Sequence, residues 1–224
     1  MNGDRPAGFS RRKLLISAGG SLLVAGTARM AGAACLAVPA QTEGPFYPRR
    51  LGEDTDWDLT HLGQGTERAQ GVVIEVSGRL LDDVCRPVSG GTIEIWQADV
   101  QGRYHHPAAA GAPDEGRGQG ADPNFQGFGR VTTDADGRYR FRTIKPAPYG
   151  LGGSFMRTPH IHFKALAPDG GALTTQMYFA GESLNGEDFI LGNVPPDLRP
   201  MVIVDFAGQS ADGVPRGIFD IVVG

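Results

Sequence analysis

The sequence predicts an all-β fold, an antiparallel β-sandwich with long loops, preceded by a signal peptide. Three observations carry this prediction. About eight short strand-like runs follow one another after residue 70, turn residues separate them, and no sustained 3.6-residue apolar stripe occurs outside the N-terminal segment. The 34 Gly and 16 Pro residues are spread along the chain rather than repeated, which suits many turns. A length of 224 residues suits one such domain.

The strand-like runs are short and alternate in polarity. In residues 138–144, Tyr139 and Phe141 share one face while the arginines share the other, as in a strand with one buried face. The preceding turn, residues 134–137, reads Asp-Ala-Asp-Gly, a strong turn signal. The runs cover residues 72–81, 92–98, 129–133, 138–144, 160–166, 174–179, 201–206 and 218–223. Residues 34–69 show little periodicity, and we expect the Pro- and Gly-rich loop at 41–48 to wrap the domain.

The N-terminal segment has the features of an export signal. Arg11 and Arg12 precede a short apolar stretch, and Ala31-Gly32-Ala33 resembles a cleavage site. Adjacent arginines indicate the twin-arginine type, and the stretch is short for a permanent membrane span. We therefore assign residues 1–33 to the signal and 34–224 to the sandwich domain. The predicted location is periplasmic or extracellular, with membrane contact only during export.

Charge and cysteine content exclude some functions. The formal net charge is −4, and residues 1–33 contribute +4, so the remainder carries −8. An acidic body argues against nucleic acid as a partner, because phosphate binding needs clustered Lys and Arg. Cys35 and Cys85 are too few for an all-cysteine zinc site. They could pair in an oxidising compartment, and the sequence leaves that pairing open.

A His-x-His pair is the first candidate for metal binding. On a strand, His160 and His162 would point to the same side with Cα atoms about 7 Å apart. Ile161 and Phe163 would then point into the core. Two imidazoles at this spacing can converge on one metal, although the pair alone suits a solvated strand face equally well.

Two tyrosines extend the candidate site. Tyr104 lies in the loop after the 92–98 run, and Tyr149 lies in a Pro-rich loop. A phenol, with a pKa of about 10, is an anionic ligand only beside a strongly charged cation. A ferrous site of two His and one carboxylate fits poorly, since no Asp or Glu follows His162 until Asp169.

Several short motifs follow one another along the chain. The motifs are Thr-Glu-Gly-Pro-Phe-Tyr at 42–47, Glu-Ile-Trp-Gln-Ala-Asp at 94–99, Gly-Arg at 129–130 with Thr-Asp at 133–134, Thr-Ile-Lys-Pro at 143–146, Arg-Thr-Pro-His-Ile-His-Phe at 157–163 and Thr-Gln-Met-Tyr-Phe at 175–179. Together they resemble one known family, the intradiol ring-cleavage dioxygenases, and its protocatechuate-type members in particular. Each motif is short, so their order makes the resemblance specific.

The resemblance implies a catalytic β-sandwich over residues 34–224 that opens a small aromatic diol with O2 between its two hydroxyls. It implies iron(III) as the cofactor, with four protein ligands: Tyr104, Tyr149, His160 and His162. It also implies that Tyr149 leaves the metal and accepts a proton as substrate binds. Arg157 would stabilise developing negative charge, and Gln176 would orient the ring oxygens.

Substrate and assembly stay open at this point. Catechol, protocatechuate and hydroxyquinol types, with cis,cis-muconate-type products, all fit, and so does a homo-oligomer. Gly150 and Leu151 follow Tyr149 where protocatechuate-type members carry bulkier residues. Two alternatives from other classes remain, an exported non-catalytic β-sandwich binding module and an exported zinc hydrolase whose third histidine is His105 or His106. Colour and metal content would separate these alternatives.

Overall fold

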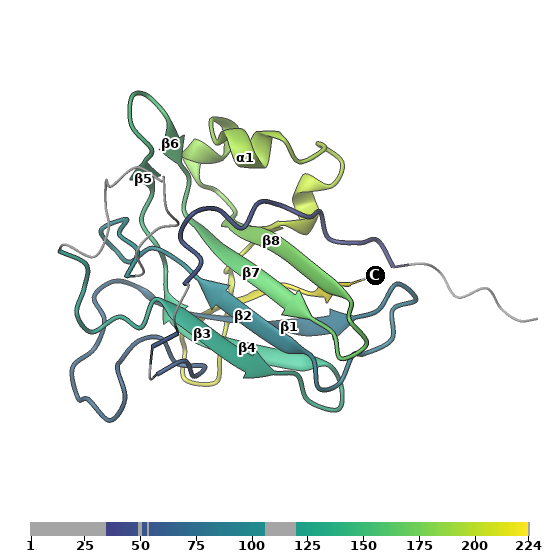
Figure 1. The fold of residues 1–224 in the computed structure, drawn as a ribbon. Coiled ribbons are helices and arrows are strands. Elements are labelled where there is room, and N and C mark those ends of the chain that lie inside the picture. Colours follow the sequence, from purple (N-terminus) through teal and green to yellow (C-terminus); the bar gives the residue numbers. More distant parts are fainter. Residues whose placement is uncertain (1–34, 49–50, 53, 106–119, 224) are drawn as a thin grey trace, which may run out of the picture. The chain divides into compact units, whose positions relative to one another are not determined.

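The computed structural model describes residues 35–48, 51–52, 54–105 and 120–223 (Figure 1). All of them belong to one compact unit. The signal predicted at 1–33 lies outside the described residues, so the boundary at 33/34 stays a prediction. Within the described ranges, none of the helices has the length and apolar character needed to cross a membrane.

The first sheet is built around β1 (Val73–Leu81). Residues 73–79 of β1 pair antiparallel with the whole of β4 (Arg138–Ile144). On its other edge it pairs parallel with β11 (Pro215–Ile218) and then with β12 (Ile221–Val222). The short β10 (Gly208–Gln209) extends this sheet beyond β11.

The second sheet has the order β3-β2-β7-β8-β9 (Figure 1). Its neighbours are antiparallel apart from the parallel pair β8–β9. The strands are β3 (Phe128–Thr132), β2 (Thr92–Trp96), β7 (His160–Leu166), β8 (Ala172–Phe179) and β9 (Ile203–Val204).

The core lies between the two sheets and confirms the predicted sandwich. Ile161 and Phe163 of β7 are fully buried in one cluster with Val76 of β1 and Phe141 of β4. Phe163 also packs against Phe219, with ring centroids 4.9 Å apart. Because side chains alternate along a strand, the residues of β7 between these apolar ones must leave the other face of the sheet.

Two predicted runs differ in detail. The run at 201–206 contains only the two-residue β9, because η2 (Arg199–Met201) begins it with a 3-10 turn. The run at 218–223 is divided between the end of β11 and β12. β9 and β12 both lie at sheet edges, where pairing is short and local patterns predict it poorly.

Three turns share one construction, with Asp at the first position and Arg at the fifth. They begin at Asp82, Asp99 and Asp134, and each carboxylate accepts hydrogen bonds from the backbone N–H groups two and four residues on. The fourth residue has a positive φ each time: 65° at Cys85, and 75° and 72° at the two glycines. Each such turn reverses the chain through a left-handed residue at its fourth position, which favours glycine.

Cys85 is the non-glycine at this turn position, and it forms a disulfide with Cys35. The bond ties the start of the described chain to the turn after β1. From there the N-terminal segment runs beside β8, where Gln41 N donates to Thr174 O at 2.8 Å. Figure 1 shows this segment, in dark purple, crossing beside β8 and β7. The predicted wrapping loop at 41–48 thus forms a strap along the second sheet, with a turn at residues 45–47.

The remaining elements are short and lie at one end of the second sheet. β5 (Tyr149–Gly150) and β6 (Met156–Arg157) form a separate two-stranded hairpin. After β8 come η1 (Ser183–Gly186) and α1 (Phe189–Gly192). Figure 1 shows this hairpin and α1 next to each other beyond β7 and β8.

Candidate metal centre

His160 and His162 leave β7 on the face opposite the core, as their spacing predicts. Each is only 2 % exposed. His160 Nδ1 lies 2.6 Å from the carbonyl oxygen of Thr158. A carbonyl can only accept, so Nδ1 carries the proton and Nε2 presents its lone pair to the site. Burial, with the positive charge of Arg157, lowers the pKa of His160 to about 3, which keeps the ring neutral.

His162 is held between an indole and a glycine. Its ring stacks on Trp96, the residue opposite it on β2, with centroids 4.8 Å apart and planes 11° apart. On the other side lies Gly44 of the strap, where a Cβ atom would stand 3.5 Å from His162 Cε1. His162 Nδ1 is buried and has no hydrogen-bond partner among the described residues. Burial lowers the pKa of His162 well below its usual value, and His160 and Arg157 add to this effect.

Tyr104 reaches the site from the Asp99 turn, which follows directly after β2. The Asp99 carboxylate is fully buried and accepts hydrogen bonds from the N–H groups of Gln101, Arg103 and Asp122. This turn delivers Tyr104, which is 2 % exposed. Phe46 of the strap stacks on the Tyr104 ring at 4.3 Å.

Tyr149 comes from β5, in register with Arg157 of β6. Directly opposed residues of an antiparallel pair project to the same side, so the phenol and the guanidinium face the same space. Burial raises the pKa of the Tyr149 phenol, and the charge of Arg157 opposes part of that rise. Tyr149 is half-buried, whereas Tyr104 is buried.

Three donor atoms of the predicted ligand set meet at one point. The Tyr104 and Tyr149 hydroxyl oxygens are 3.5 Å apart, and His160 Nε2 lies 3.4 Å from the first and 3.5 Å from the second. The His162 ring centroid is 5.0 Å from that of His160 and 6.2 Å from that of Tyr104. The structure therefore brings together all four side chains that the sequence singled out.

These separations fit a bound metal ion better than a hydrogen-bond network. Good hydrogen bonds to a phenol oxygen are roughly 2.5–3.2 Å long. Neighbouring ligand atoms of an ion with bonds of about 2.0–2.1 Å lie roughly 2.9–3.6 Å apart. Burial raises the pKa of the Tyr104 phenol well above its usual value, so both phenols would ionise only beside a strongly charged cation. Two imidazole nitrogens and two phenol oxygens suit iron, and their role as ligands remains a prediction.

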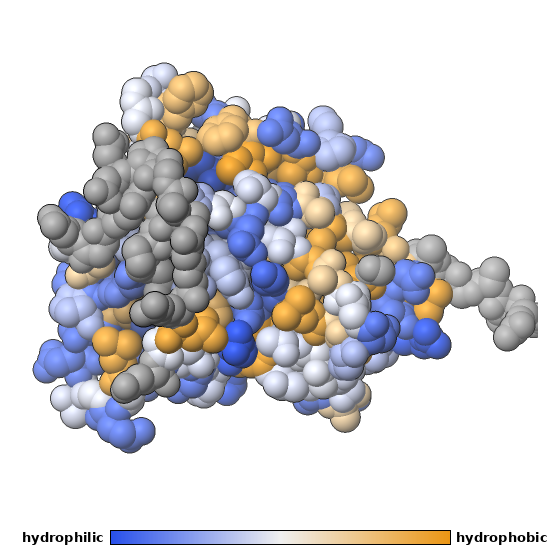
Figure 2. Space-filling model, viewed as in Figure 1, coloured by the Kyte–Doolittle hydropathy of each residue, from blue (hydrophilic) through white to orange (hydrophobic). Residues whose placement is uncertain are grey.

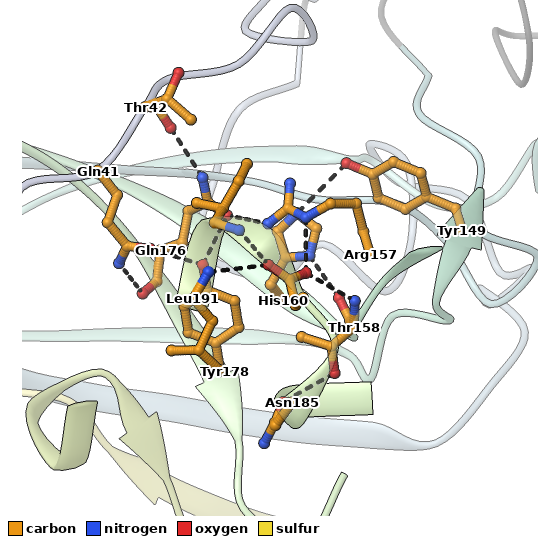
Figure 3. A network of polar contacts seen from close by, with 12 residues as sticks. Gln41, Thr42, Tyr149, Arg157, Thr158, His160, Gln176, Tyr178, Asn185 and Leu191 are labelled. Carbon is orange, nitrogen blue, oxygen red and sulfur yellow. Dashed lines mark hydrogen bonds and ion pairs between the residues drawn. The ribbon is translucent and has the colours of Figure 1, made fainter. Parts of the chain in front are cut away.

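Arg157 and Gln176 form one buried network beside these donors (Figure 3). Arg157 Nη2 donates to Gln176 Oε1 at 2.5 Å, and Gln176 Nε2 donates to the Thr42 carbonyl at 2.9 Å. Arg157 Nε donates to Asp188 Oδ2 at 2.8 Å. The Gln176 amide thus links the guanidinium to the strap. Both ends of the amide are hydrogen-bonded, so its orientation is fixed before any substrate binds.

A cavity of about 290 Å³ opens onto the two phenols. It is lined by Phe46, Gln101, Gly102, Arg103, Tyr104, Pro148, Tyr149, Gly150 and Met156. Next to it, Phe155 and Phe189 are exposed, with their rings 6.3 Å apart. Figure 2 shows hydrophobic residues gathered at the top of this face, over the β5–β6 hairpin and α1. Exposed aromatic rings therefore flank a cavity whose own lining is mixed and includes Gln101 and Arg103, while Arg157 and Gln176 lie buried.

The zinc alternative finds little support among the described residues. His105 packs against Phe125 with a centroid distance of 5.7 Å, and His106 lies outside the described ranges. In the part of the chain that is described, no group of three or more His, Cys, Asp and Glu could hold a metal ion. The partners of His160 are tyrosines instead.

Sequence reasoning missed the residues that support the site. It gave no role to Phe46 or Trp96, which pack on Tyr104 and His162, nor to the Thr158 carbonyl or Asp99. It also missed Asp188, although an Asp directly before a short apolar helix is a recognisable N-cap signal. Its pairing with Arg157 joins two chain segments 31 residues apart and left no local pattern.

Known proteins are similar to this chain in sequence and in fold. Residues 42–222 match the family model Dioxygenase_C, described as Dioxygenase. The protocatechuate 3,4-dioxygenase beta chain of Burkholderia cepacia is 40% identical over 174 residues, which are 75% of this chain and 71% of that protein. The chain spans about half the length of the curated catechol 1,2-dioxygenases that it also matches.

Solved structures agree. The dioxygenase domain of a dioxygenase carbohydrate-binding protein fusion from Streptomyces sp. SirexAA-E is 31% identical, with a TM-score of 0.56, covering 83% of this chain and 97% of that one. Catechol 1,2-dioxygenase from Acinetobacter sp. ADP1 is 25% identical, with a TM-score of 0.62. The match covers 84% of this chain and 62% of that one.

The fold and these matches define a dioxygenase built on a β-sandwich. The chain belongs to the intradiol dioxygenase family, whose named members are non-haem iron oxidoreductases. The resemblance found in the sequence, including that to protocatechuate-type members, is confirmed. Membership favours an enzyme over the non-catalytic binding module.

Proposed function

We propose that this protein is an intradiol ring-cleaving dioxygenase for a catechol-type substrate. The carbon–carbon bond between the two hydroxyl-bearing carbons breaks, and both atoms of O2 enter the product, a cis,cis-muconate-type dicarboxylic acid. The ring is oxidised by four electrons and O2 is reduced by four, so no further reductant is needed. One observation supports this proposal above all. The hydroxyl oxygens of Tyr104 and Tyr149 and Nε2 of His160 lie within 3.5 Å of one another, in a member of a family of iron enzymes.

We further propose that Tyr104, Tyr149, His160 and His162 hold ferric iron. When bound, this ion supplies Lewis acidity that withdraws charge from the substrate's ring oxygens. The four side chains bring two potential negative charges, which suits a trivalent ion better than a divalent one.

Tyr149 is the ligand that we assign to proton transfer. Both tyrosines line the cavity, but Tyr149 is the more exposed of the two, whereas the Tyr104 ring is buried and stacked on Phe46. A phenolate within hydrogen-bond reach of a catechol hydroxyl can take its proton. Arg157, opposite Tyr149, stabilises negative charge that develops on the substrate, in a site largely closed to water. Gln176 keeps the guanidinium in place and orients the ring oxygens.

Substitution of Tyr149 tests this assignment. Tyr149→Phe should retain the fold but show an altered visible band and slower substrate binding, because one phenolate and the proton acceptor are lost. The control is Tyr139→Phe, which removes a buried hydroxyl of the first sheet that donates to the carbonyl of Phe219, between β11 and β12. It should cost about 1 kcal/mol of stability and leave the spectrum unchanged. An unchanged spectrum and turnover in Tyr149→Phe would reject the assignment.

An oxygen-uptake assay would narrow the set of candidate substrates. Relatives are named for protocatechuate, catechol and 6-chlorohydroxyquinol, so a panel of these three types is the appropriate start. We expect oxygen uptake with at least one, and a product that gains two labelled oxygen atoms from ¹⁸O2. Zinc instead of iron in the purified protein, with no oxygen uptake, would revive the hydrolase alternative.

We also propose export by the twin-arginine signal predicted at 1–33. The Cys35–Cys85 disulfide supports it, because such bonds persist in oxidising compartments. Cell fractionation decides: Arg11→Lys with Arg12→Lys should keep the protein in the cytoplasm, and unchanged export would refute the proposal. Light scattering of the purified protein would show whether it forms the homo-oligomer that the sequence leaves open.

A further inference from the structure

Asp188 is a buried carboxylate that no step of the proposed reaction uses. It is 1 % exposed and makes four hydrogen bonds, two through each oxygen. Oδ1 accepts from the N–H groups of Ile190 and Leu191 and so caps α1. Oδ2 accepts from Arg157 Nε at 2.8 Å and from the Thr158 N–H at 3.0 Å.

The ion pair with Arg157 is fully desolvated. The side chains are 3 % and 0 % exposed. A buried pair of this kind adds little net stability compared with apolar packing, because removing two charges from water is costly. Capping a four-residue helix needs no charge either, since Ser or Asn caps as well as Asp. The charge on Asp188 is therefore better explained by what it does to Arg157.

The geometry of the guanidinium shows how Asp188 acts on Arg157. The group is a planar, rigid fork, so two fixed edges determine where the rest points. Asp188 fixes the Nε edge and Gln176 Oε1 fixes Nη2. The register of β5 with β6 places Tyr149 on the same side. Figure 3 shows Arg157 between Gln176 and Thr158, with Tyr149 and His160 beside it.

We propose that Asp188 is a positioning residue of the reaction, which holds the Arg157 guanidinium in the one orientation that faces Tyr149 and the substrate oxygens. The inference rests on the proposed function, since it assigns a support to Arg157. Thr158 extends the same role, because Oδ2 also accepts from the backbone N–H of Thr158, the residue whose carbonyl sets the His160 tautomer. One carboxylate thereby aligns both the cation and a predicted ligand.

Two variants separate positioning from capping. Asp188→Asn and Asp188→Ser both keep a cap acceptor for α1 but remove the charge that orients Arg157. We expect each to fold and bind iron while kcat falls about 10–100-fold with little change in KM, as for a misplaced catalytic group. In an Arg157→Gln background, adding Asp188→Asn should lower kcat by less than about 2-fold, because the group to be positioned is already gone.

The visible band of the iron-loaded protein gives a readout other than turnover. Arg157→Gln and Asp188→Asn should shift the tyrosinate band in the same direction, and the double variant should shift it no further. Wild-type kcat in both Asp188→Asn and Asp188→Ser would overturn the proposal, as would fully additive losses with Arg157→Gln.

The outcomes also separate this inference from the proposed function. If the wild-type protein cleaves no catechol, the proposed dioxygenase function is refuted, yet the shared band shift would still support the positioning of Arg157. If the wild type cleaves catechols and the Asp188 variants have wild-type kcat, only the role given to Asp188 is refuted. Should Asp188→Asn fail to fold, Asp188→Ser and the neutral double variant carry the comparison.

Discussion

His160 shows how a main-chain atom decides the chemistry of a side chain. The Thr158 carbonyl accepts from Nδ1 at 2.6 Å, so Nε2 is the nitrogen left for a metal. The His-x-His spacing predicted that both rings share a face, and that is what β7 shows. It could not predict which nitrogen faces the site, because that depends on the path of the backbone before Pro159.

Gly44 gives a prediction at the same scale. It has a φ of +72° and lies against His162. Gly213 has a φ of +80°, and a Cβ atom added there would meet no described atom within 4 Å. Gly44→Val and Gly213→Val should each lose about 1–2 kcal/mol of stability through the left-handed backbone. Only Gly44→Val should also lower iron content, because its methyl groups would press on the His162 ring.

Thermal unfolding and metal analysis of the two purified variants make the comparison. Equal iron content in both would show that the strap does not constrain His162.

Among the elements, the Asp-first turns link strand ends to chemistry. The turns at Asp99 and Asp134 have the same backbone hydrogen bonds and a glycine with positive φ at the fourth position. They differ in setting, since Asp99 is buried and Asp134 is exposed. One turn aims Tyr104 at the site, and the other merely joins β3 to β4.

This pair allows a matched test. Asp99→Ala should lower stability by about 2–4 kcal/mol, because three backbone N–H groups lose a buried acceptor. It should also weaken iron binding, because Tyr104 is no longer aimed. Asp134→Ala should cost about 1 kcal/mol and leave iron binding unchanged. Chelator competition measures iron affinity, and equal affinities in the two variants would contradict the role given to Asp99.

The elements also show where sequence patterns succeed. β4 and β7 have the predicted bounds, 138–144 and 160–166, because alternation of buried and exposed residues is strong in the first and the His-x-His motif marks the second. The β5–β6 hairpin and α1 were not predicted. Each is too short to show a period, and each is held by contacts with residues remote in the sequence, such as that of Asp188 with Arg157.

At the scale of the whole molecule, the predicted site residues come from four separated parts of the chain, at positions 104, 149, 157–162 and 176. The order of motifs predicted which side chains meet, through resemblance to a family. The tertiary supports were beyond prediction, because the strap, the Asp99 turn and Asp188 act only once both sheets have formed. The distances among Tyr104, Tyr149 and His160 likewise follow from the assembled fold.

The disulfide provides a prediction at this scale. It closes a loop with a sequence separation of 50, so its loss should cost about 2–4 kcal/mol. Cys85 also occupies a left-handed position with a φ of 65°. Cys85→Gly should therefore be more stable than Cys85→Ser by about 1 kcal/mol, although both lack the bond.

Urea unfolding of purified wild type, Cys85→Gly and Cys85→Ser, without reductant, gives the three free energies of unfolding. Cys35→Ser serves as the control that removes the bond and keeps the strained residue. If Cys85→Gly proved no more stable than Cys85→Ser, strain at this turn would not be a cost to the folded state.

The β5–β6 hairpin stands apart from both sheets, yet it carries Tyr149 and Arg157. Its loop could lengthen, shorten or change its apolar tip without breaking a single rung of either sheet. Selection can thus remodel the entrance while the scaffold stays intact. In such an architecture, preference for one aromatic compound over another can diverge quickly among relatives whose cores remain nearly the same.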